Sequence, residues 1–246
     1  MNPRIKASLR RSHFIFGLSK ALRGLVQDMR VLVWLAKRRG QISRYQKTSE
    51  TKKLQLGTSN NFLEGWFNTD IVCNDRRVVY MDATSRFPFS DNSFDYVMAE
   101  HMIEHVGYSA GGVILRECFR ILKPGGCLRF STPDLRTLLG LYAKPLSAEQ
   151  QSYIDWIIQR LMPEVRECKA TFVINNAFRA WGHCFLYDQE TLHHALLSSG
   201  FREIRFCKPG ASEDPLLRNL ESHGREIEDE SINQFETIVV EARKDN

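Results

Sequence analysis

The sequence predicts an α/β fold built around a mostly parallel sheet. Short β-like segments alternate with segments of helical periodicity, and polar or acidic residues stand directly after several of the β-like segments. A length of 246 residues, with 43% hydrophobic and 26% charged residues, fits one globular domain of this class with additions.

The N-terminal part of the chain carries the excess of positive charge. Residues 1–53 hold 14 Lys and Arg against two acids and so have a charge of +12, whereas the remaining residues have −7 and the whole chain +5. Apolar residues recur on one helical face from Phe14 to Ala36, and Lys and Arg occupy the other face. We therefore expect a basic helical arm and a polar connector within residues 1–52, ahead of a globular domain over 53–246.

Seven β-like segments follow the arm, at Lys53–Gly57, Trp66–Ile71, Val78–Asp82, Phe94–Ala99, Cys127–Thr132, Glu203–Cys207 and Thr237–Arg243. Fewer than ten residues separate the first three segments from one another, which is too short for crossover helices. We expect these early crossovers to lack helices, and the apolar face of the arm to cover the part of the sheet that they leave open.

Helical segments are predicted between and after these strands. They lie at Val113–Leu122, stopped by Lys123-Pro124-Gly125-Gly126; at Ala148–Leu161 and Val165–Ala180; and at Thr191–Ser199, capped by Asp188. The helical segments at 148–161 and 165–180 interrupt the alternation of strands and helices, so residues 133–187 are predicted to form a helical insertion or lid. Residues 208–234 are predicted to form a long polar loop.

The ends of the predicted strands are the places to look for ligands, because open parallel sheets bind ligands beyond the carboxyl ends of their strands. The first strand ends in a loop of small residues that starts at Gly57, and the second ends in Asp70. An acid in this position can accept hydrogen bonds from both ribose hydroxyls of a nucleoside, and a loop of small residues lets a ligand approach the backbone. These features favour a nucleoside-containing cofactor.

The order of motifs along the chain carries a resemblance to a known family. The motifs are Leu56-Gly57, Gly65-Trp66 with Asn68 and Asp70, Phe87-Pro88-Phe89 with Asp91 and Ser93-Phe94-Asp95, Glu104-His105, and Leu122-Lys123-Pro124-Gly125-Gly126. This order resembles the class I S-adenosylmethionine-dependent methyltransferases, and most of all their type 11 branch of small-molecule enzymes. The resemblance covers about residues 53–132 and implies a Rossmann-like fold with a mostly parallel, seven-stranded sheet.

The resemblance also implies S-adenosylmethionine as the cofactor and assigns roles to particular residues. Gly57, Thr58 and Ser59 would flank the methionine part, and Asp70 would hold the ribose. The other implied positions are Asp82 and Ala83 at the adenine, and Glu100 and His101 along the methyl-transfer cleft. Thr58 and Ser59 replace further glycines usual in the family, which either narrows the cofactor loop or supplies hydroxyls for the cofactor's carboxylate.

Methyl transfer to a hydroxyl requires alignment with the methyl group and a base, for which histidine is suited. His105 follows the fourth strand, His183 lies in an aromatic segment that closes the insertion, and His223 lies in the loop after the sixth strand. The alternatives are a helix cap for His105 and a packed lid for His183. The chain shows no metal-ligand spacing, so we expect catalysis without a metal.

These observations predict a methyltransferase, with O-methylation of a sugar, a glycan precursor or another small polar metabolite as the expected reaction. The alternative is a degenerate cofactor-binding scaffold without catalysis. A nicotinamide oxidoreductase is disfavoured because its glycine fingerprint is missing. Nucleic-acid methylation is disfavoured because the globular part is acidic.

The sequence also carries expectations about location and partners. No apolar run approaches the roughly 20 residues that span a bilayer, no signal-peptide layout is present, and the six cysteines form no C-x-x-C pair. We therefore expect a cytoplasmic protein with a small-molecule or glycan acceptor. A second expectation is a peripheral contact between the basic arm and an anionic membrane or a partner protein.

Overall fold

The computed structural model describes Leu25 and residues 28–245, and divides the chain into two compact units, Met1–Thr48 and Ser49–Asn246. In the first unit, residues 28–48 form one helix. The polar stretch from residue 38 to 53, which the sequence predicts as a connector, is therefore helical up to residue 48, because Lys, Arg and Gln favour helix and one internal Gly40 is tolerated. Residues 14–24 of the predicted arm lie outside the described residues, and its covering role stays a prediction.

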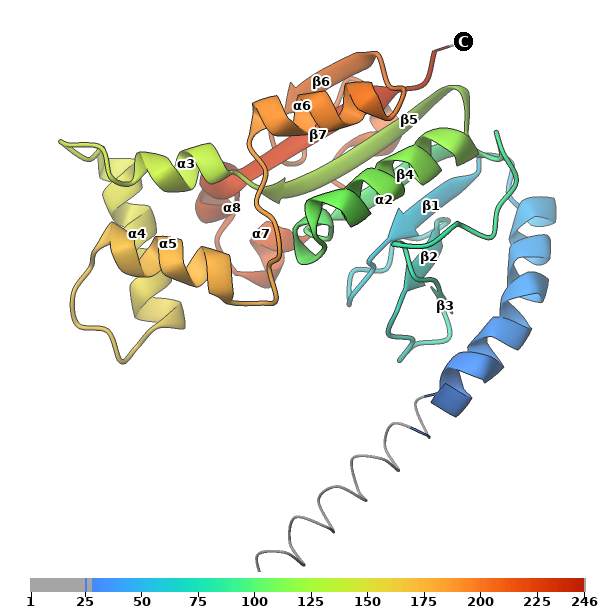
Figure 1. Ribbon diagram of the computed structural model, residues 1–246, viewed down its shortest axis with the longest axis horizontal. Coiled ribbons are helices and arrows are strands. Elements are labelled where there is room, and N and C mark those ends of the chain that lie inside the picture. Colours follow the sequence, from blue (N-terminus) through green and yellow to red (C-terminus); the bar gives the residue numbers. More distant parts are fainter. Residues whose placement is uncertain (1–24, 26–27, 246) are drawn as a thin grey trace, which may run out of the picture. The chain divides into compact units, whose positions relative to one another are not determined.

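The second unit is built on a seven-stranded sheet in the order β3-β2-β1-β4-β5-β7-β6, as Figure 1 shows. The strands are β1 Lys53–Leu56, β2 Phe67–Asp70, β3 Val78–Tyr80, β4 Phe94–Glu100, β5 Leu122–Pro133, β6 Glu203–Cys207 and β7 Thr237–Arg243. β1 to β5 pair in parallel, and β7 is antiparallel to both β5 and β6. The predicted fold class is confirmed, and β6 runs parallel to the first five strands.

The connections among the first three strands are short, as predicted. Residues 57–66 and 71–77, all of which the structure describes, form turns and extended segments without a helix. At the other side, β5 begins at Leu122, directly after a helix that ends at Ile121, so the predicted helix stop is confirmed. The strand is longer than predicted because the Pro-Gly-Gly segment is accommodated as an irregularity in the pairing with β4.

Two helices pack on one face of the sheet, α2 Tyr108–Ile121 and α6 Gln189–Ser198 (Figure 1). The Asp188 carboxylate caps α6 by accepting a hydrogen bond from the Thr191 amide at 2.8 Å, as the sequence predicted.

The insertion after β5 contains three helices, α3 Leu135–Gly140, α4 Ala148–Leu161 and α5 Ala170–Arg179. Their apolar side chains form a core of their own, which also includes Ile232. Sequence reasoning missed α3, whose six residues are too few to show a helical period. Sequence reasoning also predicted that α5 begins at Val165, five residues too early. Val165 lies in a loop, and its apolar side chain packs against this core.

The prediction of a loop over residues 208–234 is wrong. The segment contains η2 Pro215–Leu217, α7 His223–Glu226 and most of α8 Glu230–Glu236, and each is too short for its periodicity to stand out.

A buried cation on β5 holds this segment against the sheet. Arg129 is fully buried; its Nε lies 2.6 Å from Glu221 Oε1, and its Nη1 lies 2.6 Å from Glu241 Oε1 and 2.9 Å from the Ala211 carbonyl oxygen. The Arg129 guanidinium thus ties residues 211 and 221 to the centre of the sheet.

We predict that Arg129→Met lowers the free energy of unfolding by about 3–5 kcal/mol, because it leaves two buried carboxylates without their cation. The matched control is Arg205→Met on β6, which removes an exposed ion pair with Glu213 and should cost less than about 1 kcal/mol. Denaturant unfolding of both variants measures the difference. Equal losses would contradict the anchoring role of Arg129.

Candidate active site

One cavity of the second unit lies beyond the carboxyl ends of β1 and β2, beside the start of β3. It has a volume of about 510 Å³ and is lined by Ser59, Asn60, Phe62, Asp70, Val72, Asn74, Asp75 and Val78. The Asp70 carboxylate accepts hydrogen bonds from the amides of Ser59 and Val72, both at 2.9 Å. A carboxylate has lone pairs for about four hydrogen bonds, so Asp70 shapes the loop and keeps capacity for a ligand.

The loop after β1 is tightly built. Gly57 has φ of +62°, and a Cβ there would lie 2.5 Å from Cγ of Met102, so only glycine fits. Thr58 is buried and donates its hydroxyl to the Thr69 carbonyl oxygen at 3.2 Å. Ser59, at φ of +46°, lines the cavity. Of the two hydroxyl residues that replace family glycines, Ser59 is thus the one placed at the cavity.

Asp82 and Ala83 follow β3. The Asp82 carboxylate accepts hydrogen bonds from the amide and hydroxyl of Thr84, at 2.9 and 2.6 Å, and so stabilises the turn. The contact of this turn with adenine stays a prediction.

Glu100, at the end of β4, joins three segments of the chain. Its carboxylate accepts hydrogen bonds from the amides of Ser222 and His223, at 2.6 and 2.7 Å, and from the Asn61 side chain at 3.1 Å. Glu100 thereby connects the loop after β1 to the start of α7. Its carboxylate is engaged in positioning His223.

His101 follows Glu100 in the left-handed region, at φ of +42°. Its ring stacks on that of His223 with centroids 4.0 Å apart, and its Nδ1 lies 3.2 Å from Glu104 Oε1. Burial alone would lower the pKa of His101, but the carboxylates of Glu104, Glu236 and Glu100 together outweigh burial and raise it. The buried Glu104 has a lowered pKa, because the attraction of His101 exceeds the cost of burial.

A second cavity, of about 500 Å³, lies between this edge of the sheet and the insertion helices. Its polar lining includes Ser59, His101, Glu104, His105, His183, His223 and Glu236. Its apolar lining comes mostly from the insertion and includes Leu138, Trp156, Ile157, Leu161, Val173, Ala177 and Trp181. We call it the lid cavity. Ser59 lines both cavities, so they adjoin at the loop after β1.

His183 enters the lid cavity from the segment that closes the insertion. Its Nδ1 lies 2.7 Å from the Ala177 carbonyl oxygen. Because a carbonyl oxygen only accepts, Nδ1 carries the hydrogen, and Nε2 of the neutral ring keeps its lone pair. Burial lowers the pKa of His183, which favours this neutral form. The ring packs against His105 and Trp181, with centroids 5.1 and 5.5 Å apart.

His223 is oriented by a carboxylate. Its Nε2 lies 3.0 Å from Glu236 Oε1, and Tyr153 donates its hydroxyl to Glu236 Oε2 at 2.5 Å. Burial opposes the charge on Glu236, but the hydrogen bonds from His223 and Tyr153 prevail and lower its pKa. His223 therefore donates from Nε2 and has Nδ1 available as a proton acceptor.

The structure brings the three predicted catalytic histidines, His105, His183 and His223, to the lining of one cavity, together with His101. It adds Glu104 and Glu236, to which sequence reasoning gave no role. The Glu104-His105 pair was visible in the motif, whereas the pairing of Glu236 with His223 depends on the fold of α7 and α8.

Comparison with known proteins shows that part of this chain is similar to methyltransferases. Residues 55–130 match a family model described as a methyltransferase domain. A demethylmenaquinone methyltransferase from Corynebacterium kroppenstedtii is 30% identical over 131 residues, covering 48% of this chain and 46% of that protein. The ubiquinone/menaquinone biosynthesis C-methyltransferase UbiE of Idiomarina loihiensis is 27% identical over 130 residues, covering 53% and 47%. The chain thus spans about half the length of these curated relatives.

Among solved structures, an S-adenosylmethionine-dependent methyltransferase from Archaeoglobus fulgidus aligns with a TM-score of 0.45 and 18% identity, covering 87% of this chain and 94% of that one.

We predict that Asp70→Ala weakens the binding of S-adenosylhomocysteine at least 100-fold. Two hydrogen bonds from ribose hydroxyls to a carboxylate are worth about 3 kcal/mol or more together. The control is Asp75→Ala at the same cavity, because the Asp75 carboxylate is already paired with Arg77 at 2.8 Å. Isothermal titration calorimetry measures both variants, and unchanged affinity in Asp70→Ala would remove Asp70 from the cofactor site.

Proposed function

We propose that this chain, which carries a class I S-adenosylmethionine-dependent methyltransferase domain of the type 11 branch, transfers the cofactor's methyl group to an acceptor in the lid cavity. The observation that carries the proposal is that two adjoining cavities share Ser59. Asp70 would hold the ribose of the cofactor in the first cavity, and the shared Ser59 would let the sulfonium reach the second. The methyl group then meets the acceptor at the cavity's polar end.

The lining of the lid cavity supports an acceptor with an apolar body and one polar, reacting end. Aliphatic and indole side chains, mostly from the insertion, make up the apolar lining, whereas four histidines and the carboxylates of Glu104 and Glu236 dominate the polar lining, which also includes Arg160, Asn176 and Glu226. A sugar in the apolar part would lose hydrogen bonds to water without replacing them. We therefore propose a hydroxylated aromatic ring, such as a phenol or quinol, in preference to a sugar or glycan precursor. The names of the two curated relatives agree with this choice.

His223 is the residue best placed to act as the base. The acceptor hydroxyl transfers its proton to His223 Nδ1, while Glu236 stabilises the imidazolium through Nε2. The resulting anion, with charge on oxygen and on ring carbons, attacks the methyl carbon in line as the carbon–sulfur bond breaks. S-adenosylhomocysteine leaves as a neutral thioether, so charge and atoms balance.

A transfer assay with labelled methyl groups tests this proposal. Simple hydroquinones and phenols should accept label in the presence of the chain, whereas nucleotide sugars and polysaccharide fragments should not. Transfer of the label to a sugar would contradict the proposed acceptor class and favour a sugar in its place. Cofactor binding without transfer to any acceptor would favour the degenerate scaffold.

In the same assay, His223→Ala should reduce turnover about 100-fold or more, the usual contribution of a general base. The affinity of this variant for S-adenosylhomocysteine should stay within about threefold of that of the unaltered chain, because His223 is proposed to contact the acceptor and not the cofactor. His194→Ala, an exposed histidine on α6, is the matched control and should keep full turnover. Unchanged turnover in His223→Ala would exclude it as the base.

The described part of the chain contains no helix long and apolar enough to cross a membrane. We propose that the positive charge of residues 1–53 holds the protein at an anionic membrane surface, where apolar acceptors collect, at about 1 kcal/mol for each basic residue. Co-sedimentation with anionic vesicles should fall as salt rises, and should fall at least tenfold in the double variant Lys37→Glu, Arg39→Glu. Equal binding to neutral vesicles would contradict this role.

A further inference from the structure

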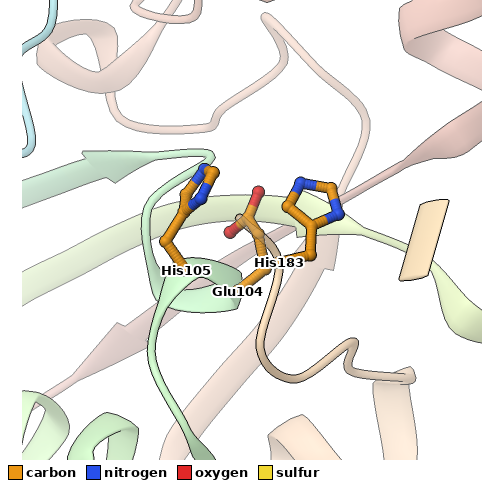
Figure 2. A group of neighbouring side chains, drawn as sticks. All are labelled: Glu104, His105 and His183. Atoms are coloured by element: carbon orange, nitrogen blue, oxygen red, sulfur yellow. The ribbon is translucent and has the colours of Figure 1, made fainter. Parts of the chain in front are cut away.

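We propose that Glu104, His105 and His183 bind one divalent first-row transition metal ion, of the kind represented by zinc, in the wall of the lid cavity. Each residue offers one ligand atom, and these three atoms lie within 4.8 Å of one another. Figure 2 shows the Glu104 carboxylate beside the imidazole rings of His105 and His183. The three residues also line the lid cavity.

The backbone holds the two parts of this cluster together. The amides of Cys184 and Phe185 donate to the Glu104 carbonyl oxygen at 2.7 and 3.2 Å, which fixes the segment after His183 to the turn that carries Glu104 and His105. Gly182 precedes His183 with φ of +80°, and a Cβ there would lie 3.9 Å from His105 Nδ1. The approach of the two histidines therefore follows from main-chain contacts as well as from side-chain packing.

The side chains around the cluster are arranged as metal ligands usually are. Histidine ligands commonly donate their second nitrogen to a carbonyl or carboxylate, which orients the ring. His183 does so through Nδ1 to the Ala177 carbonyl oxygen at 2.7 Å, leaving Nε2 for the ion. The carboxylate of Glu104 is held by the Thr132 hydroxyl at 3.2 Å from Oε2.

The environment of Glu104 supports the metal site independently of the distances between the three ligand atoms. The residue is fully buried, and its Oε1 lacks a hydrogen bond of good geometry although His101 Nδ1 lies 3.2 Å away. A buried carboxylate oxygen without a hydrogen bond is costly. A cation beside it would supply a partner for this oxygen in addition to His101.

The donor set decides the class of ion. Two imidazole nitrogens and one carboxylate suit zinc and its neighbours, whereas magnesium and calcium prefer oxygen ligands throughout. Ligand atoms of a tetrahedral zinc ion lie about 3.4 Å apart, so the cluster must tighten, which rotation of the exposed His105 ring permits. Three protein ligands leave the fourth position open, as in catalytic zinc sites.

The proposed function gives the ion its role. An ion at this position could accept the acceptor's hydroxyl oxygen as a fourth ligand and lower the pKa of that hydroxyl. This role rests on the proposed function, but metal binding itself does not. No sequence motif could reveal the site, because His105 and His183 stand far apart in the chain and meet only through the fold.

The test is metal binding by the untagged full chain after treatment with a chelator. Titration with Zn²⁺, and with Co²⁺ followed by its visible absorption, should give one ion per chain, with absorption typical of tetrahedral cobalt. His105→Ala and His183→Ala should each weaken binding at least tenfold. His105 is exposed, so its variant should keep the fold, which circular dichroism checks. His194→Ala, on the surface of α6, should bind as the unaltered chain does.

Absence of saturable binding, or binding that His105→Ala and His183→Ala leave unchanged, would overturn the inference. These titrations contain neither cofactor nor acceptor, so their result is independent of methyl transfer. Metal binding without methyl transfer would support the metal site and count against the proposed function. If the titrations show zinc binding but methyl transfer proceeds fully in the presence of a chelator, the metal site is supported and its catalytic role is excluded.

Discussion

The hydrogen bonds to the Glu100 carboxylate are the interaction on which the rest of the site depends. Glu100 ends β4 in the middle of the sheet and receives the amides of Ser222 and His223 and the side chain of Asn61. Without this carboxylate the start of α7 would lose its hydrogen bonds to β4, which hold His223 where its ring stacks on His101. The cofactor loop and the proposed base are therefore positioned by one side chain, with Arg129 anchoring the same segment from β5.

Paired charges give the lid cavity its chemistry. Glu104 faces His101, and Glu236 faces His223, and in both pairs the buried acid has a lowered pKa because its neighbours outweigh burial. Buried charges interact more strongly than exposed ones, since the surrounding protein screens them poorly. The acids remain ionised where a cation or an imidazolium is to be stabilised.

Much of the framework could be predicted from the sequence because its signals are local. Strand ends such as Asp70, the short connections after β1 and β2, and the cap at Asp188 follow from neighbouring residues. The predicted fold class is confirmed, and residues 55–130 match a methyltransferase family model, as the resemblance implied. The lid cavity could not be predicted, because α7 and α8 are short and their positions depend on Arg129 and Glu100. The cluster of Glu104 with His183 likewise depends on contacts between distant segments, and the predicted roles of individual site residues remain predictions.

The central claim is that cofactor and acceptor occupy two cavities that meet at Ser59. A crystal structure with S-adenosylhomocysteine and a bound quinol or phenol tests it most directly. The account predicts the ribose against Asp70, the cofactor sulfur beside Ser59, and the acceptor hydroxyl in the lid cavity within hydrogen-bonding distance of His223. A cofactor sulfur directed away from the lid cavity, or an acceptor bound elsewhere, would contradict it.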